Sequence, residues 1–322
     1  MRRVWISGAG GMMGSHLMEM LLQEGYEVLG TYYKPTIDLE EIAGLPLQEV
    51  DVTDWCSVYD SLAGFRPDWI FHLAAQSYPT VSWERPVETI NTNVVGTINV
   101  FEAVRRLGLK PRIVVACSSA EYGQVGEDEI PMREDRELKP LHPYGVSKVA
   151  QDLLAYQYYR SYGLETLRAR IFNCTGTRKT GDALSDFVRR VVWLERHLEA
   201  QILKVGNLET RRAIVDVRDL NRALVALAER GQAGEAYNVS GDTAYRIGEV
   251  VDLILKASTR RDLRIEQDPK LLRPTDEPVI WGDTTRLRQA TNWQQRIRLE
   301  ETIHDMLGYW RAKPTGALLA VN

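Results

Sequence analysis

Two residues in the middle of the chain have the types and the spacing that proton transfer requires. Tyr144 and Lys148 lie four residues apart in "PYGVSK", so on a helix they share one face. An ammonium beside a phenol favours the phenolate and lowers the pKa of the tyrosine. The phenol can then accept a proton from an alcohol near neutral pH while a nicotinamide accepts the hydride. Such pairs also occur on ordinary helix surfaces, so the prediction depends on the segments around them.

A second polar group follows the apolar run "RIVVA" in the stretch "CSSAEYG" (117–123). Ser118 or Ser119 can hydrogen-bond a reacting hydroxyl, and because side chains alternate along a strand only one should face the site. We predict Ser119. Glu121 is the carboxylate of this stretch, and it is either an acid/base group of the reaction or a structural helix-cap or loop carboxylate.

The stretch "GAGGMMG" places Gly8, Gly11 and Gly14 between an expected strand and an expected helix. Glycines there permit a tight turn, close approach of backbone N–H groups to a pyrophosphate, and close helix–strand packing. The spacing is GxxGxxG, and in this position at the start of the chain it predicts a dinucleotide site.

The type of dinucleotide is indicated by the residues after the second expected strand, Thr31-Tyr32-Tyr33-Lys34. NAD sites usually carry an acid here for the ribose 2′-hydroxyl. Because Lys34 suits a 2′-phosphate instead, we predict NADP, with NAD possible; a solvated loop lysine is the alternative. The predicted cofactor-binding residues are Gly8, Gly11, Met12, Met13, Gly14, Tyr32, Lys34, Asp51, Val52, Leu73, Ala74, Ala75, Tyr144 and Lys148.

Short apolar runs alternate with amphipathic stretches through the first half of the chain, which is typical of an α/β fold with a parallel sheet. We predict strands at 3–7, 26–33, 47–54, 68–76, 112–119 and 165–173, and helices at 12–25, 91–108 and 147–163. A further helix over 212–231 and a strand over 235–241 complete the main sheet.

The fold class is therefore a doubly wound parallel (Rossmann) sheet with a smaller C-terminal substrate-binding domain. The expected dinucleotide-binding domain covers 1–173 plus about 212–241, and the substrate domain covers about 174–211 plus 242–322.

Composition excludes several classes of function. The 322 residues carry a net charge of −4, which does not favour nucleic acid or an anionic membrane as a partner. No apolar stretch reaches the ~18 residues that span a bilayer. The three cysteines show no CxxC spacing and the five histidines are scattered, so we expect no metal site and a cytoplasmic protein. His142 is expected to be a loop residue.

Taken together, the motifs resemble those of the extended short-chain dehydrogenase/reductases, over essentially the whole chain. The segments that carry the resemblance are the glycine loop, "HLAAQS" (72–77), "NTNVVGT" (91–97), "SSAEYG" (118–123) and the YxxxK pair. The second half narrows it: "KVGNLETRRAIVDVRD" (204–219), "YNVSG" (237–241) and "LRPTDEP" (272–278) are similar to the GDP-mannose 4,6-dehydratases and to the related GDP-4-keto-6-deoxymannose reductases.

This resemblance implies a nucleotide-sugar substrate, most simply a GDP-hexose, bound between the two domains. It also implies a homodimer or a dimer of dimers, built from the two long helices after the fourth and fifth strands. Arginine at the substrate phosphates suits its paired hydrogen bonding. Ala213 departs from the aspartate usual in relatives. The implied substrate-binding residues are Gln76, Ser119, Asn173, Asn207, Arg212, Arg273 and Asp276.

Within this family the role of Glu121 decides the reaction. A 4,6-dehydratase oxidises carbon 4, removes the carbon 5 proton with a base and eliminates water from carbon 6. Ser119 and Glu121 match the hydroxyl and the carboxylate that the dehydratases use, so the predicted catalytic residues are Ser119, Glu121, Tyr144 and Lys148. The alternatives are a reductase, favoured by the shorter "EYG" after Glu121, and a 4-epimerase, which needs no such base.

Overall fold

The main sheet of the computed structural model, which describes residues 1–272 and 277–319, contains seven parallel strands. Their order is β10-β6-β5-β4-β1-β2-β3. The order reverses beside β1, where a doubly wound sheet opens a crevice for ligands at its carboxyl edge. The strands are β1 (Arg3–Ser7), β2 (Glu27–Tyr32), β3 (Leu47–Glu49), β4 (Trp69–His72), β5 (Arg112–Ser118), β6 (Glu165–Ile171) and β10 (Ala236–Val239).

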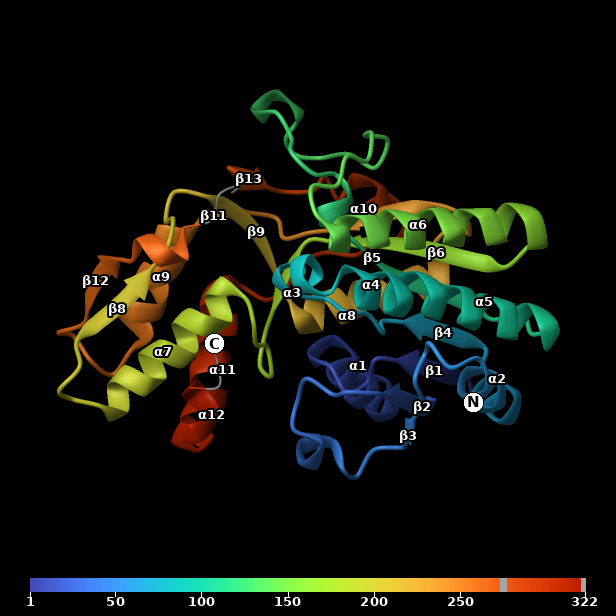
Figure 1. The fold of residues 1–322 in the computed structure, drawn as a ribbon, viewed down its shortest axis with the longest axis horizontal. Helices are drawn as coiled ribbons and strands as arrows, with labels where there is room; N and C mark the ends of the chain where they lie inside the picture. Colours follow the sequence, from blue (N-terminus) through green and yellow to red (C-terminus); the bar gives the residue numbers. More distant parts are fainter. Residues whose placement is uncertain (273–276, 320–322) are drawn as a thin grey trace.

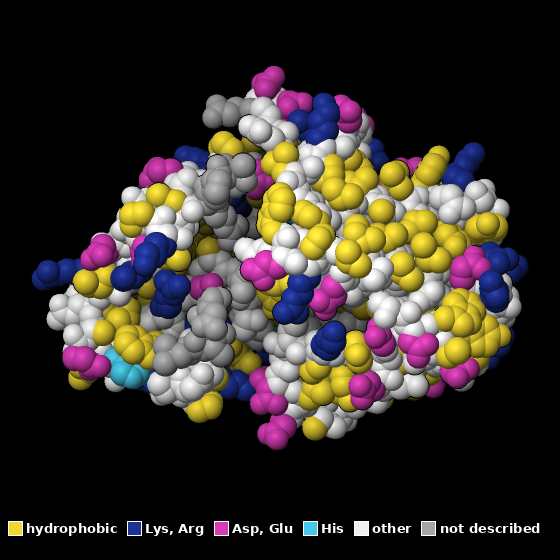
Figure 2. All heavy atoms as spheres, viewed as in Figure 1, with side chains coloured by type: hydrophobic (Ala, Val, Ile, Leu, Met, Phe, Trp, Pro, Cys, Tyr) yellow, Lys and Arg dark blue, Asp and Glu magenta, His cyan; other side chains and the backbone are white. Residues whose placement is uncertain are grey.

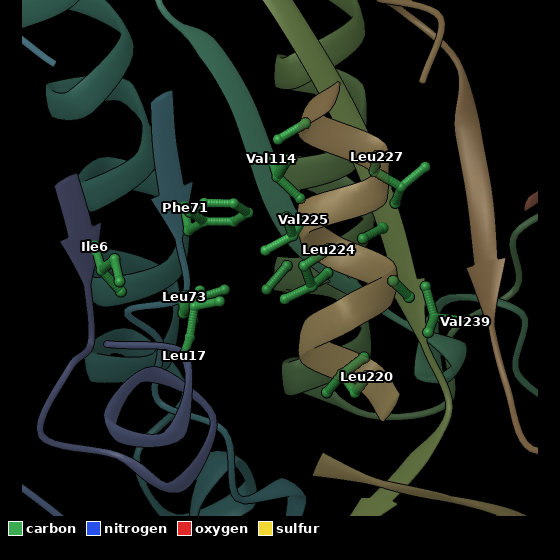
Figure 3. Packing of buried hydrophobic residues seen from close by; sticks show 14 of the residues in the cluster. Ile6, Leu17, Phe71, Leu73, Val114, Leu220, Leu224, Val225, Leu227 and Val239 are labelled. Carbon is green, nitrogen blue, oxygen red and sulfur yellow. The ribbon is translucent and has the colours of Figure 1, made fainter. Parts of the chain in front are cut away.

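Helices cover both faces of this sheet (Figure 1). On one face, α1 (Met12–Gln23), α8 (Val217–Arg230) and α10 (Thr285–Thr291) pack against the apolar strands, and the leucines of α8 point toward Val114 and Val239 (Figure 3). On the other face lie α2 (Trp55–Phe65), α5 (Gly96–Arg106) and α6 (Pro143–Tyr162). The strands are apolar on both sides because both sides are buried.

A second unit lies beyond the carboxyl edge of the main sheet (Figure 1). Its core is formed by α7 (Ala183–Arg196), α9 (Ile247–Ala257), α11 (Leu299–Ala312) and α12 (Thr315–Leu319). Strands β11, β9 and β13 form a small sheet in which β7 also pairs with β9, and β8 pairs with β12. These strands are β7 (Asn173–Thr175), β8 (Ile202–Val205), β9 (Arg211–Asp216), β11 (Ala244–Arg246), β12 (Arg264–Gln267) and β13 (Val279–Ile280).

Short helices connect these elements. They are η1 (Leu39–Ile42), α3 (Pro79–Glu84), α4 (Pro86–Ile90), the π-helix η2 (Asn91–Val95), η3 (Ser119–Glu121), η4 (Glu127–Glu129) and η5 (Pro269–Leu271). Within the described residues, none of the helices is long and apolar enough to cross a membrane.

The predicted doubly wound fold is confirmed, but several elements differ from the prediction. The strands expected over 47–54 and 68–76 end at Glu49 and His72, and the helix expected over 91–108 begins with the π-helix η2. The segment expected as one helix over 212–231 begins with β9, which pairs in the small sheet, and Asp216 then caps α8 by accepting a hydrogen bond from the Arg218 N–H at 2.8 Å. Helix α6 begins at Pro143, before the expected Ser147. Proline is favoured in the first turn of a helix, and this start places Tyr144 in the first turn.

Candidate active site

A cavity of about 1400 Å³ lies between the main sheet and the second unit. Residues of the glycine loop, of the loops after β2, β4 and β5, and of the second unit line it together. The described residues that were predicted to bind cofactor or substrate all line this cavity. Arg273 and Asp276 lie outside the described residues.

The glycine loop is shaped to bring backbone close to a ligand. Gly8 has φ +77°, a conformation that L side chains rarely adopt, and a Cβ on Gly14 would lie 2.4 Å from the Gly8 carbonyl oxygen. Helix α1 begins directly after Gly11, which provides no side-chain cap for the first-turn N–H groups. Uncapped N–H groups at a helix N-terminus bind phosphate, so this loop fits a dinucleotide pyrophosphate.

Near the end of β2, which would be the adenosine end of the cavity with a dinucleotide bound, two cations share one carboxylate. Lys34, just after β2, lies 3.6 Å from Glu88 on α4, and Arg85 lies 3.6 Å from the same side chain. All three residues line the cavity. Asp51 also lines the cavity, and it accepts hydrogen bonds from the N–H and the hydroxyl of Thr53, at 2.9 and 2.8 Å.

Tyr144 is partly buried at the base of the cavity, and Ser118 is its hydrogen-bonding partner. The serine that contacts the phenol is therefore Ser118, whereas the serine predicted to hydrogen-bond the reacting hydroxyl is Ser119. Ser118 is the last residue of β5, whereas Ser119 begins the 3₁₀ turn η3, so the strand alternation on which the choice rested ends between them. Ser119 lines the cavity without this contact to the phenol.

The surroundings of Tyr144 favour the protonated form of its phenol. Burial raises the pKa of Tyr144 to about 12, and the hydrogen bond from Ser118 offsets this only in part. The expected lowering of this pKa by Lys148 is therefore not found: the lysine nitrogen lies 5.8 Å from the phenol ring centre and donates to Ala116 O at 2.7 Å and to Gln151 Oε1 at 2.8 Å. Tyr144 in this state is a proton donor.

Glu121 does not line the cavity. Its Oε1 accepts a hydrogen bond from the backbone N–H of Ser118 at 2.7 Å, and its Oε2 lies 3.4 Å from Nε of Arg170. Burial and then the neighbouring Asp152 raise the pKa of Glu121 well above its usual range. The carboxyl group caps the turn behind the cavity wall. This position matches the alternative in which Glu121 is a structural cap and not an acid/base group.

Arg170 forms a buried ion pair with Asp152. Its Nε donates to Asp152 Oδ2 at 2.9 Å, and Arg168 donates to Oδ1 of the same carboxylate at 2.6 Å. Burial opposes ionisation of Asp152, but the two arginines outweigh it and lower its pKa. This buried cluster joins α6 to β6 beneath the strand that carries Ser118.

The far side of the cavity is formed by the second unit. Asn207 accepts a hydrogen bond from the Glu209 N–H at 3.0 Å, and Arg212 donates to the carbonyl oxygen of Glu277 at 2.8 Å. Asn173 begins β7, which pairs with β9, and it lines the cavity. Gln76 is held by Asn93, whose Oδ1 accepts from the Gln76 N–H at 2.8 Å.

Sequence reasoning missed several residues of this site. Arg178, Lys179 and Arg190 line the cavity from the segment that leads out of β7 and into α7. His142 also lines the cavity and caps α6, because its Nδ1 accepts a hydrogen bond from the Gly145 N–H at 3.0 Å. The signal for His142 was available: the proline that follows it marks a first helical turn.

Comparison with known proteins agrees with this architecture. The family model described as GDP-mannose 4,6 dehydratase matches residues 5–306. The chain is 29% identical to the GDP-6-deoxy-D-mannose reductase of Pseudomonas aeruginosa, covering 97% of this chain and 98% of that one. It is 27% identical to the GDP-mannose 4,6-dehydratase of Sinorhizobium fredii, covering 94% of each.

Among solved structures, RMD from Pseudomonas aeruginosa complexed with NADPH is similar, with a TM-score of 0.86 and 27% identity over 97% of this chain and 99% of that chain. The resemblance predicted from the motifs is confirmed, as is the prediction of an enzyme.

Proposed function

The chain belongs to the GDP-mannose 4,6-dehydratase family, a family of nucleotide-sugar-modifying enzymes. From this premise we propose that it reduces the keto group at carbon 4 of a GDP-4-keto-6-deoxyhexose. The observation that supports this reaction over dehydration is the position of Glu121, which faces Ser118 and Arg170 and not the cavity. Removal of a carbon 5 proton needs a base at the sugar, whereas reduction of a ketone does not.

The remaining carboxylates agree with this proposal. Among the described residues, the carboxylates that line the cavity come from the adenosine end or from the second unit, and none comes from the β5 tip that carries Ser118. They are Asp51, Glu88, Asp182, Asp186 and Glu277.

The protein groups at the base of the cavity supply what reduction of a ketone requires. A bound NADPH would provide the hydride. Tyr144, protonated because of its burial, donates its proton to the carbon 4 oxygen as that oxygen gains charge. Ser118 hydrogen-bonds the phenol and lines the cavity, so its hydroxyl is available to the same oxygen. The phenolate that remains regains its proton from solvent, and Lys148 lines the cavity beside it, with its nitrogen 5.8 Å from the phenol ring centre.

Purified protein incubated with NADPH and GDP-4-keto-6-deoxymannose tests this proposal. We expect oxidation of NADPH in a one-to-one ratio with loss of the keto sugar. GDP-mannose without added cofactor should give no product. A 4-keto-6-deoxy product from GDP-mannose with no net use of NADPH would overturn the proposal.

Dehydration is the second candidate, and it is favoured by the description of the matching family model and by the Sinorhizobium fredii relative. In that reaction Glu121 would have to leave its cap and reach carbon 5. Exchange of the carbon 5 hydrogen with deuterated solvent, blocked in Glu121→Gln, would support this candidate.

The choice of NADP over NAD is also a proposal. Lys34 and Arg85 bring two positive charges to the end of β2, where the adenosine ribose of a dinucleotide lies. A 2′-phosphate can replace the Glu88 carboxylate as their shared partner. The similar solved structure contains NADPH, which is consistent with this choice.

We further propose a homodimer in a reducing, cytoplasmic compartment. Exposed apolar residues gather over α3, α4 and α6, and Figure 2 shows hydrophobic side chains crowded on this face of the molecule. A second copy of the chain would cover them. The three cysteines are free thiols, as expected in a reducing compartment. The apolar residues of this face are Trp83, Val87, Val146, Leu153 and Tyr156.

A further inference from the structure

A continuous chain of buried hydrogen bonds links Lys148 to the end of β1. Lys148 Nζ donates to Gln151 Oε1 at 2.8 Å, and Gln151 Nε2 donates to Thr97 Oγ1 at 2.9 Å. Thr97 Oγ1 also lies 2.9 Å from His72 Nε2, and His72 Nδ1 lies 2.8 Å from Ser7 Oγ. All five side chains are buried, so water does not compete for these bonds.

The direction of each bond follows from counting protons at Thr97. Its hydroxyl has one proton, which it donates to the Asn93 carbonyl oxygen at 2.6 Å. Thr97 must therefore accept from both Gln151 and His72, since two lone pairs remain. His72 consequently carries its proton on Nε2.

The hydrogen bonds at Ser7, the other end of this series, agree with the assignment. Ser7 Oγ accepts hydrogen bonds from the backbone N–H groups of Leu73 and Ala74, each at 3.1 Å, so its own proton is left for His72 Nδ1. His72 is therefore neutral, and burial lowers its pKa to about 3, which keeps it so at physiological pH.

This arrangement fixes the orientation of Gln151. The proton of the Thr97 hydroxyl is already donated to Asn93, so Thr97 can only accept a hydrogen bond from Gln151. The NH₂ group of Gln151 must therefore face Thr97, and its carbonyl oxygen must face Lys148. Two of the three ammonium protons of Lys148 are thus held by Gln151 and by the Ala116 carbonyl oxygen. The third remains for the cavity, which Lys148 lines.

We propose that Gln151 is a positioning residue of the active site, which holds Lys148 in its ammonium form with one proton directed into the cavity. Gln151 lies three residues after the lysine of the YxxxK pair, on the same helix. An apolar side chain of similar size would fill the same space without offering an acceptor.

The ammonium needs this support because burial lowers the pKa of Lys148 to about 8. Within the described part of the chain, the two oxygens of Ala116 and Gln151 are the acceptors that hydrogen-bond its nitrogen. Other titratable groups lie around the Lys148 nitrogen without a hydrogen bond to it. They come from β4, from the end of β5 and from α6, and they are His72, Cys117, Glu121, Tyr144 and Asp152.

Two substitutions of Gln151 should shift the titration of Lys148 in opposite directions. Gln151→Met keeps the volume but removes the acceptor, so the pKa of Lys148 should fall by about one unit. Gln151→Glu places a carboxylate against the ammonium, so the pKa should rise by about one unit or more. The matched controls are Gln157→Met and Gln157→Glu, at an exposed position of the same helix.

The measurement is an NMR titration of the full-length protein with isotope-labelled lysine side chains, in which Lys148→Met identifies the Lys148 signal. This readout needs no substrate, so it remains valid if the protein does not reduce the keto sugar. Failure of that reduction in the wild type would count against the proposed function alone. Where reduction is observed, the high-pH limb of its rate profile should move with the Lys148 titration in both Gln151 variants.

Shifts in the same direction, or no shift in folded variants, would overturn the proposal. If Gln151→Glu does not fold, Thr97→Val takes its place. Thr97→Val removes the hydroxyl that accepts a hydrogen bond from the Gln151 amide, and it should lower the pKa of Lys148 by less than Gln151→Met does. An unchanged titration in both Gln151→Met and Thr97→Val would equally overturn the assignment.

Discussion

The Glu121 carboxylate and the Ser118 backbone N–H form a 2.7 Å hydrogen bond across the turn that ends β5. Ser118 returns the contact, since its hydroxyl accepts from the Ala120 N–H at 3.2 Å. This reciprocal capping box rigidifies the turn that carries the Ser118 hydroxyl toward Tyr144. Glu121 therefore contributes to the site through the position of Ser118.

Glu121→Gln is expected to retain activity within about threefold, because burial raises the pKa of this carboxyl and the amide oxygen can accept the same hydrogen bond. Glu121→Ala leaves the Ser118 N–H buried without a partner and should lower the free energy of unfolding by about 1–3 kcal/mol. Steady-state reduction rates and urea denaturation of both variants test this. A loss of more than a hundredfold in Glu121→Gln alone would assign the carboxylate a direct role in proton transfer and favour dehydration.

Tyr144→Phe is expected to lower the rate of ketone reduction by about 10²- to 10⁴-fold, because it removes the proton donor. Binding of NADPH, followed by fluorescence, should change little. Tyr162→Phe removes a phenol from an exposed position of the same helix and should leave the rate unchanged. A Tyr144→Phe enzyme with wild-type activity would mean that another group protonates the product.

The sequence was sufficient to predict those parts of the fold that are set by local pattern. The apolar runs and the glycine loop predicted both ends of strand β1, the helix α1 and the parallel, doubly wound sheet. Tyr144 and Lys148 were predictable because their spacing places them on one helical face.

Orientation at the β5 tip was not predictable in the same way. Whether Ser118 or Ser119 faces the phenol depends on where the strand gives way to a 3₁₀ turn, and alternation does not indicate that point. The pKa of Tyr144 depends on burial, which is set by packing of distant segments. Glu121 was ambiguous because a capping box and a catalytic carboxylate have the same residue type.

The stability of the protein should fall between neutral and mildly acidic pH because of His72. Burial lowers its pKa from 6.5 to about 3, so the unfolded chain takes up a proton that the folded protein does not. The contribution of neutral His72 to the free energy of unfolding is complete above pH 6.5 and is lost as the pH falls toward 3. The loss amounts to about 3 kcal/mol between pH 6.5 and 4.

Urea denaturation across this pH range, compared between wild type and His72→Gln, measures the effect. The variant should be less stable at pH 7 but show a flatter dependence on pH. His304→Asn, at an exposed position, serves as the control. An equally steep dependence in His72→Gln would show that other groups are responsible.

Cofactor selectivity should depend on the two cations beside Glu88. Lys34→Ala and Arg85→Ala are each expected to raise the KM for NADPH about tenfold and to leave the KM for NADH nearly unchanged, since only NADPH carries the 2′-phosphate. Glu88→Gln should lower the KM for NADPH, because it removes the carboxylate that competes for both cations. Because these side chains are exposed, the effects should shrink at high salt. Equal changes for both cofactors would place the 2′-phosphate elsewhere.

The exposed apolar face of α6 provides the last prediction. Leu153 is 52% exposed although it lies on the same helix as Tyr144 and Lys148, and Val146 is 48% exposed two turns earlier on that helix. A charge at Leu153 would be buried without a partner in a dimer, so Leu153→Asp should convert a dimer to a monomer in sedimentation velocity. Leu198→Asp makes the same change at a leucine that is 70% exposed in the second unit, and it should leave the dimer intact. A wild-type monomer, or a dimer that survives Leu153→Asp, would mean that a different surface, or none, joins two copies of the chain.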